Sequence, residues 1–190
     1  MRKAQPANHI LVFLMCTLFS AAFICDAFAF SKNGQEDRDR LIKQIRRELA
    51  TLPYYGVFDW LEFELRPDNT VVLRGYVVRP TTKKDAEARI RKIPGVTGVV
   101  NEIEVAPVSP EDDRLRLALY RTIYDWDSPL FRYATQAIPS IHIIVKNGRA
   151  VLKGVVSSKA DAQLAYTRAR AVPGLFDVKS DLQVETEEAR

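Results

Sequence analysis

The apolar positions of this chain change their spacing several times, and each change predicts a different element. After residue 39 they recur at helical spacing until Pro53 ends the helix; the apolar stripe consists of Leu41, Ile42, Ile45, Leu49 and Leu52. Residues 61–65 then alternate between apolar and polar, which predicts a half-buried strand. Residues 71–77 follow a short turn and predict the partner strand of a hairpin.

A second helix and a third strand complete this unit. Residues 80–92 place apolar side chains on one helical face, and Pro94-Gly95 ends the helix. Residues 99–105 supply the last strand. Because a helix crosses between the second and third strands, these strands are expected to be parallel neighbours or members of one mixed sheet. The predicted order of elements is αββαβ.

The whole pattern occurs twice, at an offset of 79 residues. Segment 71–77 matches segment 150–156 without a gap, and the turns and closing strands that follow also match: 93–96 with 172–175, and 102–105 with 181–184. Such self-similarity indicates a tandem repeat of one small domain. The sequence therefore predicts an α+β protein of two tandem αββαβ sandwiches, each a small mixed sheet packed on two helices.

The N-terminal residues are typical of an export signal. Two basic residues precede an apolar run over residues 10–24, and Ala27-Phe28-Ala29 fits the small-x-small rule for cleavage after Ala29. Retention of this segment as an uncleaved anchor is the alternative. Cleavage would place the mature protein in the periplasm and remove both cysteines, Cys16 and Cys25. No disulfide or cysteine-ligated metal is then expected.

These patterns divide the chain into five parts. We expect a signal peptide, a first domain, a linker stiffened by two prolines, a second domain and an acidic tail, at residues 1–29, 37–105, 106–110, 111–185 and 186–190. The signal carries two basic residues and one acidic residue, so its removal changes the formal net charge from +4 to +3. A charge this small, together with export, argues against a nucleic-acid partner.

The repeated motifs resemble the BON domain, a family of bacterial osmotically inducible and nodulation proteins. The resemblance covers Asp37 to Glu185 and is carried by the Leu-basic-Gly strands and the Pro-Gly turns into the closing strands, most specifically 145–154 and 172–184. The first unit departs from it, with Asp68-Asn69 where the family favours Asn-Gly. The resemblance implies an αββαβ sandwich, export to the periplasm, and binding of phospholipid surfaces in envelope maintenance or osmotic stress.

Gly75 and Gly154 stand at matching positions in the two units. Strand alternation puts them on the apolar side of their strands, so we interpret both as structural residues that let a helix lie close to the sheet. No phosphate-binding loop surrounds either glycine.

Nothing in the sequence predicts catalysis, a cofactor or a metal site. His142 is the single histidine after residue 29, and it lies on the opposite strand face from Ile141 and Ile143. No nucleophile motif accompanies it. The acidic pairs Asp112-Asp113 and Asp125-x-Asp127 lack the calcium-binding loop pattern, and helix capping and solvation explain them better.

Each unit carries an aromatic loop after its first helix. Tyr54, Tyr55, Phe58 and Trp60 form the first loop. The second spans residues 124–133, and its predicted lipid-contact residues are Trp126, Leu130, Phe131 and Arg132. Aromatic rings beside a basic residue suit a membrane interface. The alternative is that these rings plug the end of a small sandwich or form the interface between the two units.

Two classes of function stay open at this point. The first is non-catalytic binding to an anionic phospholipid membrane surface or another envelope component. The second is a protein-interaction module, because a sheet with an exposed strand edge can dock an envelope protein or build homo-oligomers by edge pairing.

Overall fold

The computed structural model describes residues 34–185, so the predicted export signal and acidic tail lie outside the described residues. The chain divides into two compact units, residues 1–44 and 45–190. Residues 34–50 are helical, and the predicted stripe is confirmed because Leu41, Ile45 and Leu49 are buried. No helix within the described residues is long and apolar enough to span a membrane.

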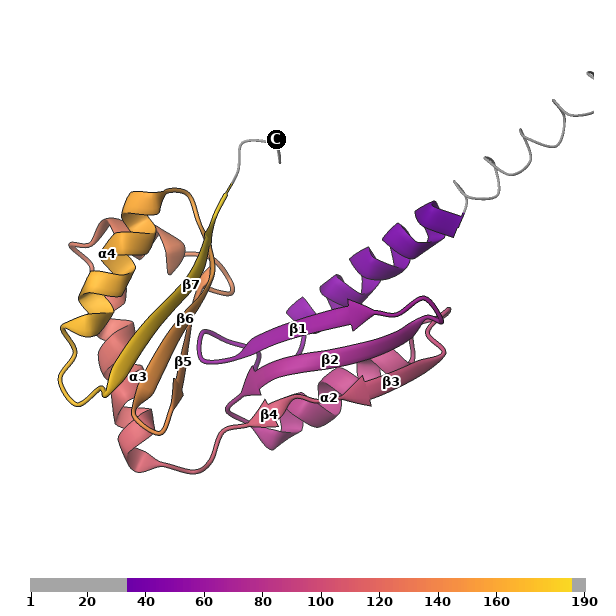
Figure 1. The fold of residues 1–190 in the computed structure, drawn as a ribbon, viewed down its shortest axis with the longest axis horizontal. Coiled ribbons are helices and arrows are strands. Elements are labelled where there is room, and N and C mark those ends of the chain that lie inside the picture. Colours follow the sequence, from indigo (N-terminus) through magenta and orange to yellow (C-terminus); the bar gives the residue numbers. More distant parts are fainter. Residues whose placement is uncertain (1–33, 186–190) are drawn as a thin grey trace, which may run out of the picture. The chain divides into compact units, whose positions relative to one another are not determined.

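The first repeat forms a small mixed sheet (Figure 1). Strands β1 and β2 pair antiparallel as a hairpin, and β2 pairs in parallel with both β3 and β4. Asn69 has a positive φ of 61° in the hairpin turn, where Asp68 accepts a hydrogen bond from the Thr70 amide. The elements are β1 Trp60–Leu65, β2 Thr70–Val77, α2 Pro80–Arg91, β3 Gly98–Asn101 and β4 Glu104–Val105.

The second repeat has the same order with a longer closing strand. Its three strands lie in the order β5-β6-β7, with β5 antiparallel and β7 parallel to β6. Asn147 and Gly148 both have positive φ, as a two-residue hairpin turn requires. The elements are α3 Pro110–Ile123, the 3₁₀ helix η1 Pro129–Tyr133, β5 Ile141–Lys146, β6 Arg149–Val156, α4 Lys159–Arg170 and β7 Asp177–Val184. The α+β prediction with two sheet-and-helix units is confirmed.

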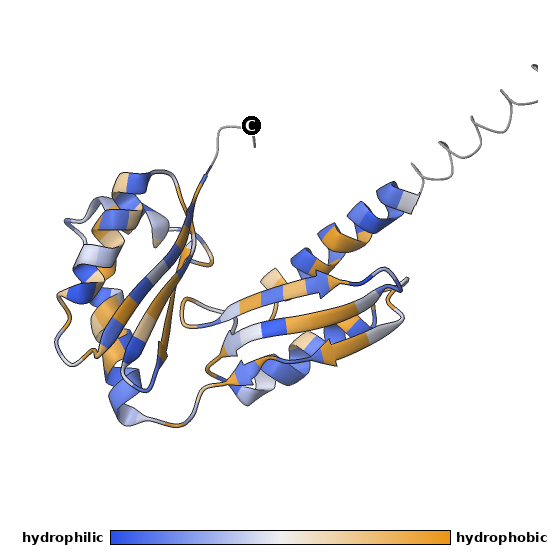
Figure 2. Ribbon diagram, in the orientation of Figure 1, coloured by the Kyte–Doolittle hydropathy of each residue, from blue (hydrophilic) through white to orange (hydrophobic). Residues whose placement is uncertain are grey.

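The core follows from the alternation of apolar and polar residues, visible as orange and blue stretches on strands and helices in Figure 2. In the second domain, the inward residues of β5 and β6 pack with one face of α3 and α4. Tyr124 ends α3 and is buried, and its hydroxyl donates to the Ile141 carbonyl at 2.6 Å. This bond fixes the end of α3 to the start of β5, and so sets where the following loop leaves the core.

The two repeated glycines are required for a different reason from the predicted one. Both have strongly positive φ, 126° at Gly75 and 125° at Gly154. A Cβ at Gly75 would overlap the carbonyl oxygen of Trp60, and a Cβ at Gly154 would overlap that of Ser140. The predicted close approach of a helix is therefore wrong. The backbone of the paired strand, at the start of β1 or β5, occupies the space that a Cβ would need. Only glycine adopts this backbone conformation without strain.

Candidate functional site

An aromatic pair of the second domain joins Trp126, between α3 and η1, with Phe131 inside η1. Trp126 is 79% exposed, and its ring centroid lies 4.7 Å from that of the half-buried Phe131. Ser128 begins η1 by accepting a hydrogen bond from the Leu130 amide. This cap holds Phe131 beneath Trp126, so the tryptophan ring is supported on one side while most of its surface faces solvent.

Leu130 does not belong to this exposed surface. Its side chain is fully buried in the core of the second domain, together with Tyr133. In a 3₁₀ helix, residues three apart share a face, which points Leu130 and Tyr133 inward and leaves Phe131 nearer the surface. The prediction of Leu130 as a lipid-contact residue is therefore wrong.

Arg132 is exposed but already paired. One guanidinium nitrogen donates to the Asp161 carboxylate at 2.5 Å and to the Tyr133 hydroxyl at 3.0 Å. Burial raises the pKa of Asp161, but hydrogen bonds from Ser158 and Tyr133 and the charge of Arg132 outweigh it, and the net shift is downward. Asp161 therefore stays ionised and competes with a phosphate for Arg132.

The loop around Trp126 is acidic rather than basic. Asp125 and Asp127 flank the tryptophan, and the Asp125 carboxylate accepts the Asp127 amide at 3.0 Å. Two carboxylates beside an aromatic ring oppose attraction to an anionic surface. Any membrane contact at this loop therefore depends on the rings more than on charge.

The aromatic loop of the first domain is occupied by protein contacts. Tyr55 and Trp60 lie against His142 of β5, with ring centroids 5.6 and 5.1 Å away. Phe58 makes a T-shaped ring contact with Tyr120 on α3, and the Ile143 amide donates to the Val57 carbonyl. The alternative interpretation, an interface between the two repeats, therefore describes these residues.

His142 is buried by this interface. Only 6% of its surface is exposed, and Nδ1 has no hydrogen-bond partner. Burial lowers the pKa of His142 below its ordinary value, so the imidazole is neutral at pH 7. The ring contacts of His142 with Tyr55 and Trp60 indicate a packing role for this side chain.

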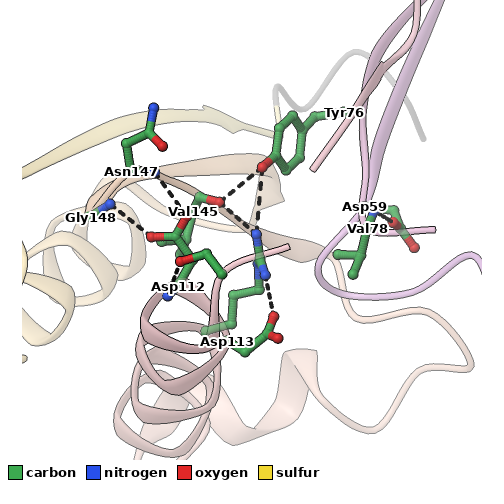
Figure 3. A network of polar contacts seen from close by, with 10 residues as sticks. Asp59, Tyr76, Val78, Asp112, Asp113, Val145, Asn147 and Gly148 are labelled. Carbon is green, nitrogen blue, oxygen red and sulfur yellow. Dashed lines mark hydrogen bonds and ion pairs between the residues drawn. The ribbon is translucent and has the colours of Figure 1, made fainter. Parts of the chain in front are cut away.

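A polar network lies at the N-terminal end of α3 (Figure 3). Arg116 is 2% exposed; it donates to the Val145 carbonyl at 2.8 Å and pairs with Asp113. The Tyr76 hydroxyl donates to the same carbonyl at 3.1 Å. Sequence reasoning missed Arg116, although a basic residue directly after the core residue Leu115 was an available signal.

Asp112 holds the hairpin turn of the second domain. Its carboxylate accepts the Asn147 amide at 2.9 Å and the Gly148 amide at 2.8 Å (Figure 3). The predicted explanation by capping and solvation is wrong for this buried residue, because Ser109 caps α3 and Asp112 binds the turn. No group of three or more residues able to hold a metal ion occurs within the described part of the chain.

Comparisons with known proteins place this geometry in a family. A family model described as the BON domain matches residues 37–107 and 131–186. The search of curated proteins gives no match.

The comparison with solved structures gives, among others, two of CdsD, a structural protein of the type III secretion system of Chlamydia trachomatis. One is 13% identical over 78% of this chain and 94% of that chain, with a TM-score of 0.31. The other, its C-terminal domain, is 14% identical over 77% and 98%, with a TM-score of 0.28.

The family match covers more than half of the chain and falls on both repeats. The first segment contains all strands of the first sheet, and the second contains β5, β6, α4 and β7. Together with the shared element order, this match shows that the chain belongs to the BON domain family.

Proposed function

We propose that this protein is a non-catalytic periplasmic envelope protein whose second BON domain binds a phospholipid membrane surface through Trp126 and Phe131. Membership of the BON family supports an envelope-associated role without catalysis. Export by cleavage after Ala29 is part of the proposal. The observation that carries it is Trp126, which is 79% exposed and whose ring contacts that of Phe131 at a tilted angle.

An exposed tryptophan at a loop tip is costly in water and favourable at a bilayer interface. The ring sits at the level of the lipid headgroups, where its apolar body and its polar N–H both find partners. Phe131 extends the apolar contact beneath it. The pairing of Arg132 with Asp161 and the flanking carboxylates predict that anionic lipid adds little to the affinity.

Co-sedimentation with vesicles tests this proposal. The chain after signal removal, residues 30–190, is mixed with neutral phosphatidylcholine vesicles and with vesicles that also contain phosphatidylglycerol. We expect binding to both, and Trp126→Ala should lower the bound-to-free ratio roughly tenfold through lost apolar burial. Phe131→Ala should have a smaller effect in the same direction.

Phe176→Ala is the matched control. Phe176 is an equally exposed aromatic residue, 83% exposed, but it lies beside the hairpin turn at Gly148 rather than in the Trp126 loop. This variant should bind vesicles as the unmodified chain does. Equal binding by the Trp126 and Phe176 variants, or no binding by the unmodified chain, would overturn the proposal.

A further inference from the structure

The second domain presents one strand edge that no other described segment covers. Its sheet has two edges, β5 and β7. On the β5 edge, the Ile143 amide is bonded to the Val57 carbonyl. Strand β7 pairs with β6 alone among the described strands, over eight residues without interruption. An uninterrupted, uncovered edge of this length is a template for pairing with another strand.

A groove lies alongside this edge. It has a volume of about 690 Å³ and lies between α4 and β7. The half-buried Val178, Leu182 and Val184 form the apolar part of its β7 wall, and Ala162 and Tyr166 form the apolar part of its α4 wall. Polar residues complete the lining: Lys179, Ser180 and Asp181 on β7, and Lys159 and Gln163 on α4. A strand added to β7 would place every second side chain beside these apolar residues, because successive side chains point to opposite faces of the sheet.

The backbone of β7 fixes which residues can accept an added strand. The Glu185 amide donates to Val156 of β6, so the odd-numbered residues of β7 direct their polar backbone groups toward β6. The even-numbered residues Val178, Ser180 and Leu182 then direct theirs outward. In an antiparallel pair, these residues must lie opposite residues of the added strand whose backbone groups point back toward β7. The side chains of both strands that face the groove must also lie on the same face of the extended sheet.

A second copy of β7 meets both conditions when the two strands pair about Ser180. Val178 of one copy then lies opposite Leu182 of the other, twice, beside the grooves. On the other face, Lys179 lies opposite Asp181, also twice. Both charged side chains are exposed, and Asp181 lies 3.8 Å from Lys153 of its own domain.

The neighbouring registers are electrostatically unfavourable. If the two strands pair about Lys179 instead of Ser180, the Lys179 side chains of the two copies lie opposite each other. If they pair about Asp181, the two Asp181 side chains lie opposite each other. Like charges directly opposite each other in a sheet are destabilising. The charge pattern therefore selects the register centred on Ser180, and it suits an identical strand.

We propose that the β7 edge is a homodimerisation surface, on which two copies of this chain pair their β7 strands antiparallel about Ser180. The contact is isologous, so it closes as a dimer with two-fold symmetry and does not propagate into a fibre. The first domain offers no equivalent, because its third strand is interrupted between β3 and β4. This inference is independent of vesicle binding, which is proposed for the Trp126 loop.

Sedimentation analysis of residues 30–190 over a range of concentrations tests the dimer. A contact of one strand and one groove is small, so we expect a reversible dimer that forms as the concentration rises toward about 1 mM. A monomer at every concentration up to that limit would overturn the proposal. The same samples can be tested for vesicle binding, so failure of one proposal is distinguishable from failure of the other.

Charge reversal gives a sharper test. Lys179→Asp and Asp181→Lys each place like charges opposite each other twice, so each variant should dimerise about tenfold more weakly. The double variant K179D/D181K restores both attractions and should dimerise as the unmodified chain does. Mixing the two single variants should give a heterodimer. Additive weakening in the double variant, without recovery, would contradict the Ser180 register.

Ser180→Pro tests the backbone pairing. Proline removes the amide at the centre of the proposed contact but, since that amide faces outward, leaves the bonds to β6 intact. We expect at least a tenfold loss of dimer with an unchanged circular dichroism spectrum, whereas Ser180→Ala should keep the dimer. If the proline variant is misfolded, the charge-reversal series decides the question, since its exposed substitutions leave the core unchanged.

Discussion

The third strands of the two domains occupy equivalent places and differ in one residue that matters. The 79-residue offset aligns Asn101 with Ser180. In the first domain the strand is divided into β3 and β4, whereas β7 is continuous. The Asn101 amide nitrogen donates to the Lys83 carbonyl at 3.0 Å and to the Glu87 carboxylate at 3.1 Å, and its oxygen accepts the Ile103 amide.

This comparison shows how one asparagine side chain can interrupt a strand and so remove a regular edge for pairing. Asparagine offers the backbone a local hydrogen bond that competes with regular strand geometry. Asn101 accepts the backbone amide two residues ahead and ties the strand to α2. Among the described residues, Ser180 makes no such side-chain hydrogen bond, so the second domain keeps a regular edge. The same repeat thus yields one closed edge and one open edge.

The largest expected effect concerns the glycine that both domains have at the same place, Gly75 and Gly154. Gly154→Ala and Gly75→Ala should each lower the free energy of unfolding by about 3 kcal/mol or more, because the new Cβ overlaps a backbone carbonyl and φ is positive. Urea unfolding followed by circular dichroism measures this loss. Similar losses in the two variants would show that the repeats depend equally on this glycine.

Gly56→Ala is the control for both glycine variants. A Cβ at Gly56 meets no atom within 4 Å, and its φ lies outside the left-handed region. The free energy of unfolding should change by no more than about 0.5 kcal/mol. A Gly154 variant as stable as this control would show that the sheet relaxes around the new side chain.

A smaller effect is expected where the domains differ. Asn101→Ala removes the side-chain bonds that interrupt the first edge, and it should cost about 1–2 kcal/mol of unfolding free energy. Ser180→Ala at the matching position should change stability by less than about 0.5 kcal/mol. Urea unfolding of the two variants side by side checks the contrast, and equal losses would refute a special role for Asn101.

Periodicity and repetition were sufficient to predict the architecture, because they record which face of each element is buried. Helical spacing gave the buried Leu41, Ile45 and Leu49, and Asn147-Gly148 gave the tight turn of the second hairpin. The glycine pair was recognised as structural, but the carbonyl that approaches it comes from the far side of the hairpin, which spacing does not reveal.

The candidate site was less predictable because it depends on contacts distant in sequence. Arg132 looked available for a headgroup until the structure paired it with Asp161, 29 residues later. Leu130 and Phe131 are adjacent apolar residues, and only the turn of η1 decides that one is buried and the other supports Trp126. The charge pattern of β7 was visible in the sequence, but its meaning required knowing which edge is free.

The pH dependence of stability gives the last and smallest contrast between the domains. The hairpin registers align His142 with Glu62, since Ile141 lies opposite Gly154 as Leu61 lies opposite Gly75. Burial lowers the pKa of His142 in the folded state, so the unfolded chain binds this proton more readily. The stability contributed by neutral His142 is therefore complete above about pH 6.5 and is lost as the pH falls below that value.

One such proton changes the free energy of unfolding by at most about 1.4 kcal/mol per pH unit. Urea unfolding between about pH 7.5 and 5.5 should show stability falling with pH in the unmodified chain, and His142→Gln should flatten this slope. Glu62→Gln is the matched control, because hydrogen bonding by Trp60 lowers the pKa of Glu62 below its already acidic ordinary value, so it stays ionised over this range. An unchanged slope in the His142 variant would mean that this proton is bound equally well in the folded and unfolded chain. The interface with Tyr55 and Trp60 would then tolerate a charged imidazole at His142. The burial of His142 argues against this outcome.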